Sequence, residues 1–208
     1  SGKNELQEIT LPPDTSFQKV FISQISKTPE NVATDSDGNW LATYRLAPEE
    51  VLDVVVSGNV YVAIDPIYEK GYVLSHEQRK LYTRPLKYWE STDEIRKLAN
   101  KLKTPEKIYQ YVVSTLEYDY SRVVPGIERL GAARALEQPK QAVCMEFTDL
   151  FVAIARSAGI PARAVHGYAY TTNSKLQPLS LVSDILHAWP QYYDEARHIW
   201  VAIDPTWG

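Results

Sequence analysis

The only cysteine of the 208-residue chain, Cys144, stands directly before a segment with helical apolar spacing. Apolar residues recur from Phe147 to Ala158 at intervals of three and four, which predicts a helix with one stripe turned toward a core. Gly159 and Pro161 predict its end at Ala158. Unpaired N–H groups and the positive dipole end at its N-terminus would stabilise a thiolate and could donate to an oxyanion. A lone cysteine beside an apolar stripe is often a packing residue, so a nucleophile needs a partner base.

Candidate partners for the cysteine lie near the C-terminal end of the sequence. Alternating and β-branched residues predict three strands, over residues 162–168, 187–193 and 199–203. Asp194-Glu195-Ala196-Arg197 would join the last two strands as a hairpin connection. Antiparallel pairing around that loop brings His187 close to Asp204. A histidine that takes the proton of a cysteine, held by a carboxylate, is the arrangement of a catalytic triad.

Three motifs in this order resemble the transglutaminase-like superfamily, a branch of the papain-like cysteine enzymes. They are Cys144-Met145-Glu146-Phe147 continuing to Ala158–Arg163 and Gly167-Tyr168, then His187-Ala188-Trp189, then Asp204-Pro205-Thr206. The resemblance spans Ser91 to Trp207. It implies that Cys144 is the nucleophile, that His187 is the general base and acid, and that Asp204 orients His187.

The spacing of apolar residues changes along the chain from a strand pattern to a helical pattern, which predicts an α+β fold. Four runs between Thr10 and Ile64 (QKVFIS, WLATYRL, VLDVVV and NVYVAI) predict a small β-rich domain over residues 1–80, with turns at Asp37–Trp40 and Ser57–Asn59. Three helices are predicted after this domain. Ser91 opens the first with a capping box, Pro105 lies in the first turn of the second, and the third covers Ile127–Glu137. Residues 81–208 would form the papain-like, transglutaminase-like core, a helical layer carrying the cysteine at a helix N-terminus and packed on an antiparallel sheet. Because related domains continue with further strands, we expect this core to be truncated at its C-terminus.

Other candidate site residues carry weaker signals. The resemblance suggests an aromatic oxyanion residue upstream of the cysteine, and Tyr118 and Tyr120 are the candidates, although packing at a helix end explains them equally well. Gln138 and Gln141 precede Cys144 as oxyanion glutamines do in papain-like enzymes. His166 and His198 are expected to be bystanders, and His76 belongs to no motif.

Composition excludes several classes of function. Lys and Arg number 22 against 26 Asp and Glu, a net charge of −4 without a dense basic block, so nucleic acid is not an expected partner. One cysteine allows neither an internal disulfide nor a multi-cysteine zinc site. The DSDGN stretch lacks the oxygen ligands of a calcium loop and is expected to be a turn. No apolar run reaches the roughly 20 residues of a membrane span. We expect no metal and no cofactor.

These observations predict cysteine-dependent acyl transfer on protein or peptide amides through a thioester. Water would complete hydrolysis, as in a protease or amidase, and a lysine amine would complete a crosslink; hydrolysis is favoured by resemblance to microbial members. The alternative is a catalytically silent binding or structural module that keeps the fold. Oligomeric state and localisation stay open, with an extracellular or cell-envelope location expected if a targeting segment was removed ahead of Ser1.

Overall fold

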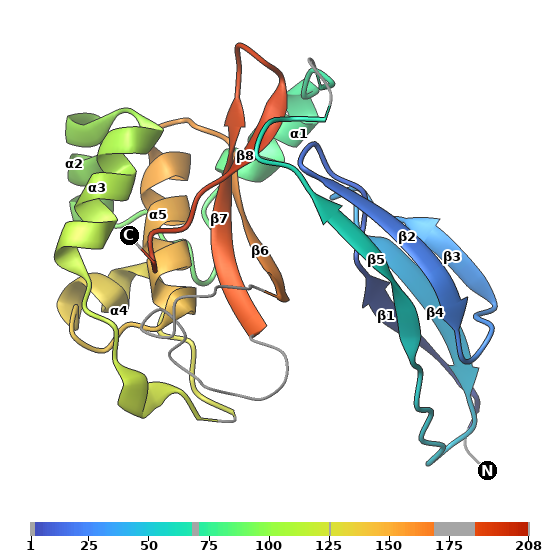
Figure 1. Ribbon diagram of the computed structural model, residues 1–208. Helices are drawn as coiled ribbons and strands as arrows, with labels where there is room; N and C mark the ends of the chain where they lie inside the picture. The colour runs from blue at the N-terminus through green and yellow to red at the C-terminus, as the bar shows by residue number, and fades with distance from the viewer. Residues whose placement is uncertain (1–2, 68–70, 125, 169–185, 208) are drawn as a thin grey trace. The chain divides into compact units, whose positions relative to one another are not determined.

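The structure is a computed structural model in which residues 3–67, 71–124, 126–168 and 186–207 are described. The chain forms two compact units, residues 1–69 and residues 70–208, called here the N-terminal and C-terminal units (Figure 1). Strands make up the N-terminal unit, and helices with an antiparallel sheet make up the C-terminal unit. The predicted α+β class, with a small strand-rich region before a core of helices packed on an antiparallel sheet, is therefore confirmed.

The N-terminal unit consists of two small antiparallel sheets. One has the order β1 (Glu5–Leu11), β4 (Trp40–Leu46), β3 (Asn31–Thr34), and the other pairs β2 (Gln18–Ile25) with β5 (Val56–Val62). Leu11, Ala42 and Tyr44 are its buried hydrophobic residues, and partly buried side chains from both sheets pack against them. The unit therefore has a small core of its own.

One predicted turn of this unit is confirmed and the other is wrong. Between β3 and β4, Gly38 adopts φ +89° and the Asp35 carboxylate accepts hydrogen bonds from Asp37 N and Asn39 N, which is an Asx turn. Ser57–Asn59 instead lies inside β5, where Gly58 pairs with Ile22. A Cβ at Gly58 would lie 2.4 Å from the Phe21 carbonyl oxygen, so this glycine permits a close strand approach rather than a turn. The VLDVVV run forms no strand of its own: only its last residue joins β5.

In the C-terminal unit, helices pack around one central helix that lies on a three-stranded sheet (Figure 1). The antiparallel sheet has the order β6-β7-β8, and helix α5 contacts β6, β7, α1, α2, α3 and α4. The helices are α1 (His76–Thr83), α2 (Asp93–Leu102), α3 (Pro105–Thr115), the 3-10 turn η1 (Tyr120–Arg122), α4 (Ala132–Glu137) and α5 (Cys144–Ser157). The strands are β6 (Ala162–Tyr168), β7 (Leu186–Asp194) and β8 (Ile199–Ala202).

Two predicted helix starts need correction, and one helix was not predicted. Thr92 rather than Ser91 caps α2, because its side chain accepts from Ile95 N at 3.3 Å, whereas the Ser91 hydroxyl lies 3.1 Å from that of Ser157. Helix α4 begins at Ala132 rather than Ile127, because Gly131 adopts φ +81° and interrupts helical backbone. Helix α1 was not predicted, because apolar residues in that part of the sequence show no clear helical spacing.

Helix α5 is buried on all sides, not only along its predicted apolar stripe. Every residue from Glu146 to Arg156 is buried, including the two carboxylates Glu146 and Asp149. The predicted C-terminal end is confirmed: Gly159 adopts φ +79°, Gly159 N donates to Arg156 O, and Ile160 N donates to Ala155 O. This Schellman pattern satisfies the last carbonyls and turns the chain into β6.

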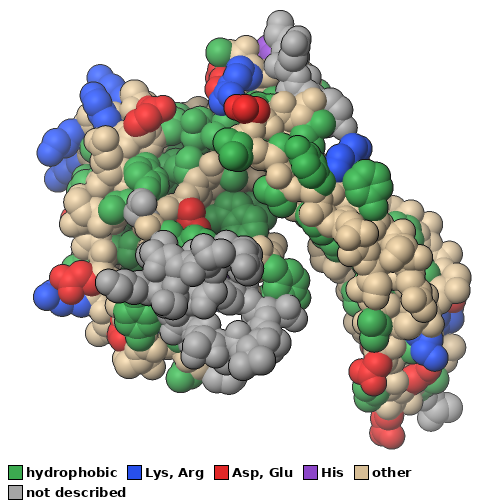
Figure 2. Space-filling view, in the orientation of Figure 1, with side chains coloured by type: hydrophobic (Ala, Val, Ile, Leu, Met, Phe, Trp, Pro, Cys, Tyr) green, Lys and Arg blue, Asp and Glu red, His purple; other side chains and the backbone are tan. Residues whose placement is uncertain are grey.

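Charged and hydrophobic side chains occupy different parts of the visible surface of this unit. On the face shown in Figure 2, Lys and Arg side chains lie mainly at the outer edge, over α2 and α3 in the orientation of Figure 1, and hydrophobic side chains gather toward the strands. In the described part of the chain, no helix is both long enough and apolar enough to cross a membrane.

The end of α5 yields a stability prediction. Gly159→Ala should lower the free energy of unfolding by about 1 kcal/mol, because an L side chain strains the left-handed backbone. A Cβ at Gly159 would meet nothing within 4 Å, so steric contact should not contribute. Chemical denaturation measures the loss, and Gly159→Asn is the control, since Asn tolerates this conformation better. Equal losses in both variants would contradict the backbone explanation.

Candidate active site

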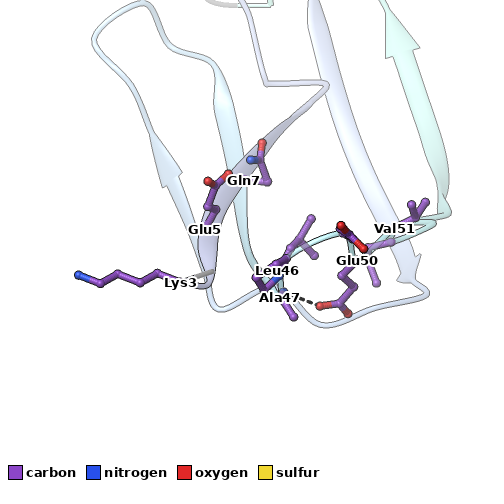
Figure 3. A pocket seen from close by; sticks show the side chains of 10 residues that line it. Lys3, Glu5, Gln7, Leu46, Ala47, Glu50 and Val51 are labelled. Carbon is purple, nitrogen blue, oxygen red and sulfur yellow. Dashed lines mark hydrogen bonds between the residues drawn. The ribbon is translucent and has the colours of Figure 1, made fainter. Parts of the chain in front are cut away.

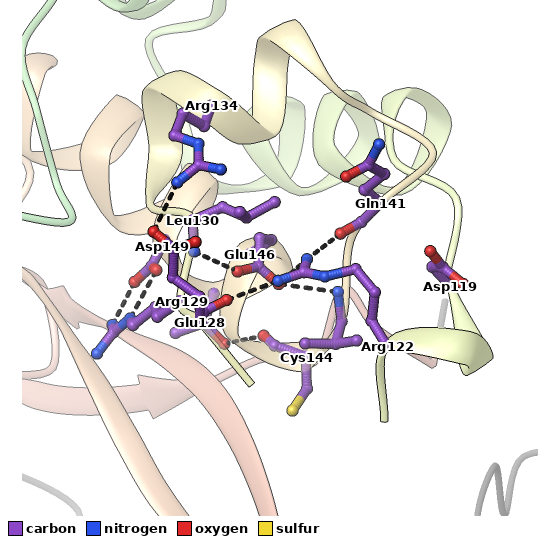
Figure 4. A network of polar contacts seen from close by, with 12 residues as sticks. Asp119, Arg122, Glu128, Arg129, Leu130, Arg134, Gln141, Cys144, Glu146 and Asp149 are labelled. Atoms are coloured by element: carbon purple, nitrogen blue, oxygen red, sulfur yellow. Dashed lines mark hydrogen bonds and ion pairs between the residues drawn. The ribbon is translucent and has the colours of Figure 1, made fainter. Parts of the chain in front are cut away.

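Cys144 is the first residue of helix α5, as predicted, and its side chain is partly buried. Val143 precedes it with extended backbone, and the first backbone bond of the turn runs from Glu146 N to Val143 O at 2.9 Å. The N–H groups of Cys144 and Met145 precede that bond and are positioned to donate to an anion. In Figure 4 the thiol points away from the polar network around the start of the helix.

His187 and Asp204 are in direct contact, which confirms their predicted proximity. His187 Nε2 lies 2.7 Å from Asp204 Oδ2, and the two side chains are 5% and 28% exposed. His187 is on β7, whereas Asp204 follows the end of β8. A buried imidazole with a carboxylate on one ring nitrogen has a fixed tautomer and orientation.

The hairpin that produces this contact has a different register from the predicted one. Asp194 pairs with Ile199 rather than with Arg197, because the connecting loop includes His198 in left-handed backbone at φ +57°. The shift is two residues, so the alternation of faces along β8 is preserved. Asp204 therefore reaches His187 from beyond the strand instead of lying directly opposite it.

Cys144 lies near enough to His187 to influence the pKa of its imidazole. Because Nε2 faces Asp204, the nitrogen left for the thiol is Nδ1. Burial by itself disfavours the imidazolium, but the hydrogen bond to Asp204 and the influence of Cys144 outweigh it and raise the pKa of His187 from 6.5 to about 9. The imidazole is therefore protonated at neutral pH.

Of the two candidate oxyanion tyrosines, Tyr118 lies nearer the cysteine. Tyr118 forms a parallel bridge with Ala142, two residues before Cys144, and its ring centroid is 6.3 Å from that of Phe147. Burial, and then the nearby Cys144, raise the pKa of Tyr118. The phenol is therefore protonated at neutral pH and can donate. The Tyr120 ring is centred 4.9 Å from that of Tyr118 and tilted by 52° to it, and Tyr120 is 59% exposed.

The two candidate glutamines have different surroundings. Gln138 ends helix α4, with its backbone N–H donating to Arg134 O at 2.9 Å. Gln141 accepts a hydrogen bond from Arg122 through its backbone carbonyl, and Figure 4 shows its side-chain amide pointing away from Cys144. That geometry does not favour Gln141 as an oxyanion donor.

A buried carboxylate beside the cysteine was not recognised from the sequence. Glu146 is fully buried and accepts hydrogen bonds from Leu130 N at 2.8 Å and Val143 N at 2.9 Å (Figure 4). Its carboxylate also lies 3.4 Å from the Arg122 guanidinium. Arg122 in turn donates to the carbonyls of Gln141 and Glu128. Glu146 thus ties the residue before Cys144 to two neighbouring loops.

A second buried carboxylate follows one turn later in α5. Asp149 accepts hydrogen bonds from Trp89 Nε1 at 2.7 Å and from the Arg129 guanidinium. Burial raises the pKa of Asp149 to about 6, although Arg129 and Trp89 oppose the shift. The signal in the sequence was a pair of acidic residues spaced by three within an otherwise apolar helix. An exposed helical face gives the same pattern, so the pair alone does not reveal burial.

The other histidines have different partners. His166 lies on β6 opposite Ala188, and burial together with the charge of Arg129 lowers its pKa. His198 Nδ1 lies 3.2 Å from the Tyr193 hydroxyl. His76 begins helix α1. In the described residues no group of His, Cys, Asp and Glu is arranged to hold a metal ion.

A pocket of about 700 Å³ lies in the N-terminal unit (Figure 3). It is lined by Lys3, Glu5, Gln7 and residues 46–52, and the Glu50 carboxylate there accepts a hydrogen bond from Ala47 N at 2.7 Å. Among the residues that the structure describes, this lining holds no cysteine, histidine or serine.

Comparisons with known proteins agree with this fold. The family model for the transglutaminase-like superfamily matches residues 90–205. A proposed cysteine protease from Cytophaga hutchinsonii superposes with a TM-score of 0.61 at 19% identity, covering 97% of this chain and 71% of its own. The periplasmic domain of TgpA from Pseudomonas aeruginosa gives 0.56 at 17% identity, covering 100% and 71%. Its ethylmercury-bound form gives 0.56 at 18% identity, covering 100% and 73%. No curated protein matches the chain.

The Glu146 contacts yield a prediction about stability. Glu146→Ala should lower the free energy of unfolding by about 3 kcal/mol, because it leaves Arg122 and two backbone N–H groups without their buried partner. Glu128→Ala is the control, since the Glu128 side chain is 75% exposed and should contribute at most about 1 kcal/mol through its pair with Arg134. Urea denaturation compares the two, and similar small losses would contradict an anchoring role for Glu146.

The His187–Asp204 bond yields a prediction about pH. Asp204→Asn should lower the pKa of His187 from about 9 toward 6.5, measured by NMR titration of the imidazole. Because this bond raises the folded-state pKa, its stabilisation is fully present below about pH 6.5 and is lost as the pH rises through about 9. The stability difference between wild type and Asp204→Asn should shrink over that range.

Asp194→Asn is the matched control for this titration. Asp194 sits in the β7–β8 hairpin and bonds Arg197 rather than His187. The pKa of His187 should not change in that variant. A His187 pKa that is unaffected by Asp204→Asn would show that the contact is not formed in solution.

Proposed function

Because the chain belongs to the transglutaminase-like superfamily, we propose that it is an enzyme that transfers acyl groups from peptide or protein amides through Cys144. One observation carries the proposal: the imidazole of His187 is held by Asp204 at 2.7 Å and lies near enough to Cys144, at the N-terminus of α5, for the two groups to interact. The likeness to a proposed cysteine protease supports the same class of chemistry.

The first half-reaction uses an ion pair of the Cys144 thiolate and the His187 imidazolium. The Cys144 thiolate attacks the carbonyl carbon of a substrate amide, and the C–N bond breaks as His187 gives its Nδ1 proton to the departing amine. The products are a thioester on Cys144, a free amine and a neutral imidazole. Asp204 keeps Nδ1 directed at the reacting atoms throughout.

The negative charge on the substrate oxygen needs donors close to Cys144. The Cys144 N–H at the start of α5 is one candidate, and the Tyr118 hydroxyl, whose pKa is raised by burial and by Cys144, is the second. Tyr120, Gln138 and Gln141 have weaker claims, because Tyr120 is exposed, Gln138 ends helix α4 and the Gln141 amide points away from Cys144 (Figure 4). We therefore assign the oxyanion role to the helix N-terminus and Tyr118.

The second half-reaction decides the product. Neutral His187 takes a proton from water, which attacks the thioester and releases an acid, or from a lysine amine, which forms an isopeptide bond. We propose hydrolysis as the principal outcome, in line with the proposed protease among the similar structures. The likeness to the periplasmic domain of TgpA supports a location outside the cytoplasm. No step requires a metal or a cofactor.

The reactivity of Cys144 tests the proposal. Iodoacetamide should alkylate wild type rapidly down to about pH 5, because the thiolate persists beside the imidazolium, and His187→Ala should slow the reaction at least tenfold below pH 7. His198→Asn is the control, because Asn tolerates the left-handed backbone at that position, and it should react like wild type. Mass spectrometry of the intact chain gives the rates.

Alkylation that rises only near about pH 8.5 and does not depend on His187 would favour a catalytically silent binding module. If the thiol is reactive, incubation of an unfolded protein substrate with a primary amine separates the two products. New peptide termini or deamidated side chains indicate hydrolysis, and incorporation of the amine indicates crosslinking.

A further inference from the structure

Two tryptophan rings lie nearly parallel to the imidazole of His187. The Trp207 ring is centred 5.0 Å from the imidazole at an interplanar angle of 14°, and the Trp189 ring is centred 5.9 Å away at 26°. Both distances fall in the range of stacked aromatic pairs. The His187 side chain is 5% exposed, so these contacts contribute to a ring that is almost sealed from water.

A glycine makes room for one of these indoles. Gly167 on β6 pairs with His187 on β7, and a Cβ at Gly167 would lie 2.8 Å from Cη2 of Trp189. Any side chain there would push the indole away from its present position. Gly167 therefore permits the close packing of Trp189 beside the imidazole.

The other indole is carried by the same turn that supplies Asp204. Thr206 N donates to Asp204 Oδ1 at 3.0 Å, which folds the segment after β8 back on itself. Asp204 then meets the edge of the imidazole while Trp207, three residues later, meets its face. One short turn thus fixes both the direction and the plane of the ring.

We propose that Trp207 and Trp189 are positioning residues for His187, holding its imidazole in the plane in which Nε2 meets Asp204 and Nδ1 is left free for Cys144. The inference rests on the proposed function of His187 as the acid and base of the reaction. A histidine ring held by one hydrogen bond can still rotate about its Cβ–Cγ bond, and flat neighbours on its face prevent that rotation.

The stacked indoles also affect the charge of the ring. The face of an indole attracts a cation, so Trp207 and Trp189 favour the imidazolium over the neutral imidazole. Among the described residues, the titratable groups that act on His187 are Asp204, which bonds the ring, and Cys144, which influences its pKa. Replacing Trp207 by leucine keeps an apolar cover but removes the π face, which separates this effect from burial.

Titration of His187 in a Cys144→Ala background tests the proposal without any need for turnover. Trp207→Leu should lower the pKa of His187 by about 0.5 to 1 pH unit, and Trp207→Phe should keep most of the wild-type value. NMR of the imidazole protons gives the pKa, and with 4 histidines in the chain the His187 signal is assigned by its loss in His187→Gln.

With Cys144 intact, Trp207→Leu should slow iodoacetamide alkylation below pH 7 several-fold. Gly167→Ala, which displaces Trp189, should slow it in the same direction. Trp200→Phe is the matched control: Trp200 packs edge-on against Tyr82 and Tyr193 rather than against His187, so neither the pKa nor the rate should change.

An unchanged His187 pKa in folded Trp207→Leu, or an equal fall in Trp200→Phe, would overturn the proposal. If Trp207→Leu does not fold, Gly167→Ala supplies the comparison, and a wild-type pKa of His187 together with a wild-type alkylation rate in that variant would overturn the proposal. A pKa that falls as expected while wild-type Cys144 is unreactive would support the positioning role and reject the proposed function, so the two failures are distinguishable.

Discussion

The C-terminal unit depends on the complete burial of helix α5. A helix that carries two carboxylates can be buried only if each carboxylate finds partners, because an unpaired buried charge costs several kcal/mol. Glu146 meets that requirement with Arg122 and the backbone N–H groups of Leu130 and Val143, and Asp149 meets it with Arg129. The contacts that make burial tolerable therefore also fix the segments that lead into Cys144.

The sheet contributes the second half of the site under a different constraint. Strand β7 places His187 in a buried position, and the turn after β8 brings Asp204 to its edge and Trp207 to its face. A buried imidazole would ordinarily lose its proton, but the carboxylate and the thiol reverse that tendency and raise the pKa of His187 to about 9. Burial thus excludes water from the His187 imidazole, while Asp204 and Cys144 keep the ring protonated.

Family and function rest on different observations. At 17% and 19% identity, the likeness to solved structures shows the fold, and folds of this kind can host more than one activity. The functional proposal depends instead on the contact between His187 and Asp204 and on the position of Cys144 at the N-terminus of a buried helix. The N-terminal unit has a small core of its own.

The sequence by itself determined the elements whose signals are local. Helix α5 could be predicted from apolar spacing and from Gly159, and the last two strands from alternation, so Cys144, His187 and Asp204 could be named before the structure. The β7–β8 register, the inclusion of Ser57–Asn59 in β5, and the partners of Glu146 and His187 were decided only by tertiary structure. Registers and buried charge pairs depend on residues far apart in the chain, and stacking on an imidazole depends on where a strand and a turn finally pack. A pattern of neighbouring residues does not contain that information.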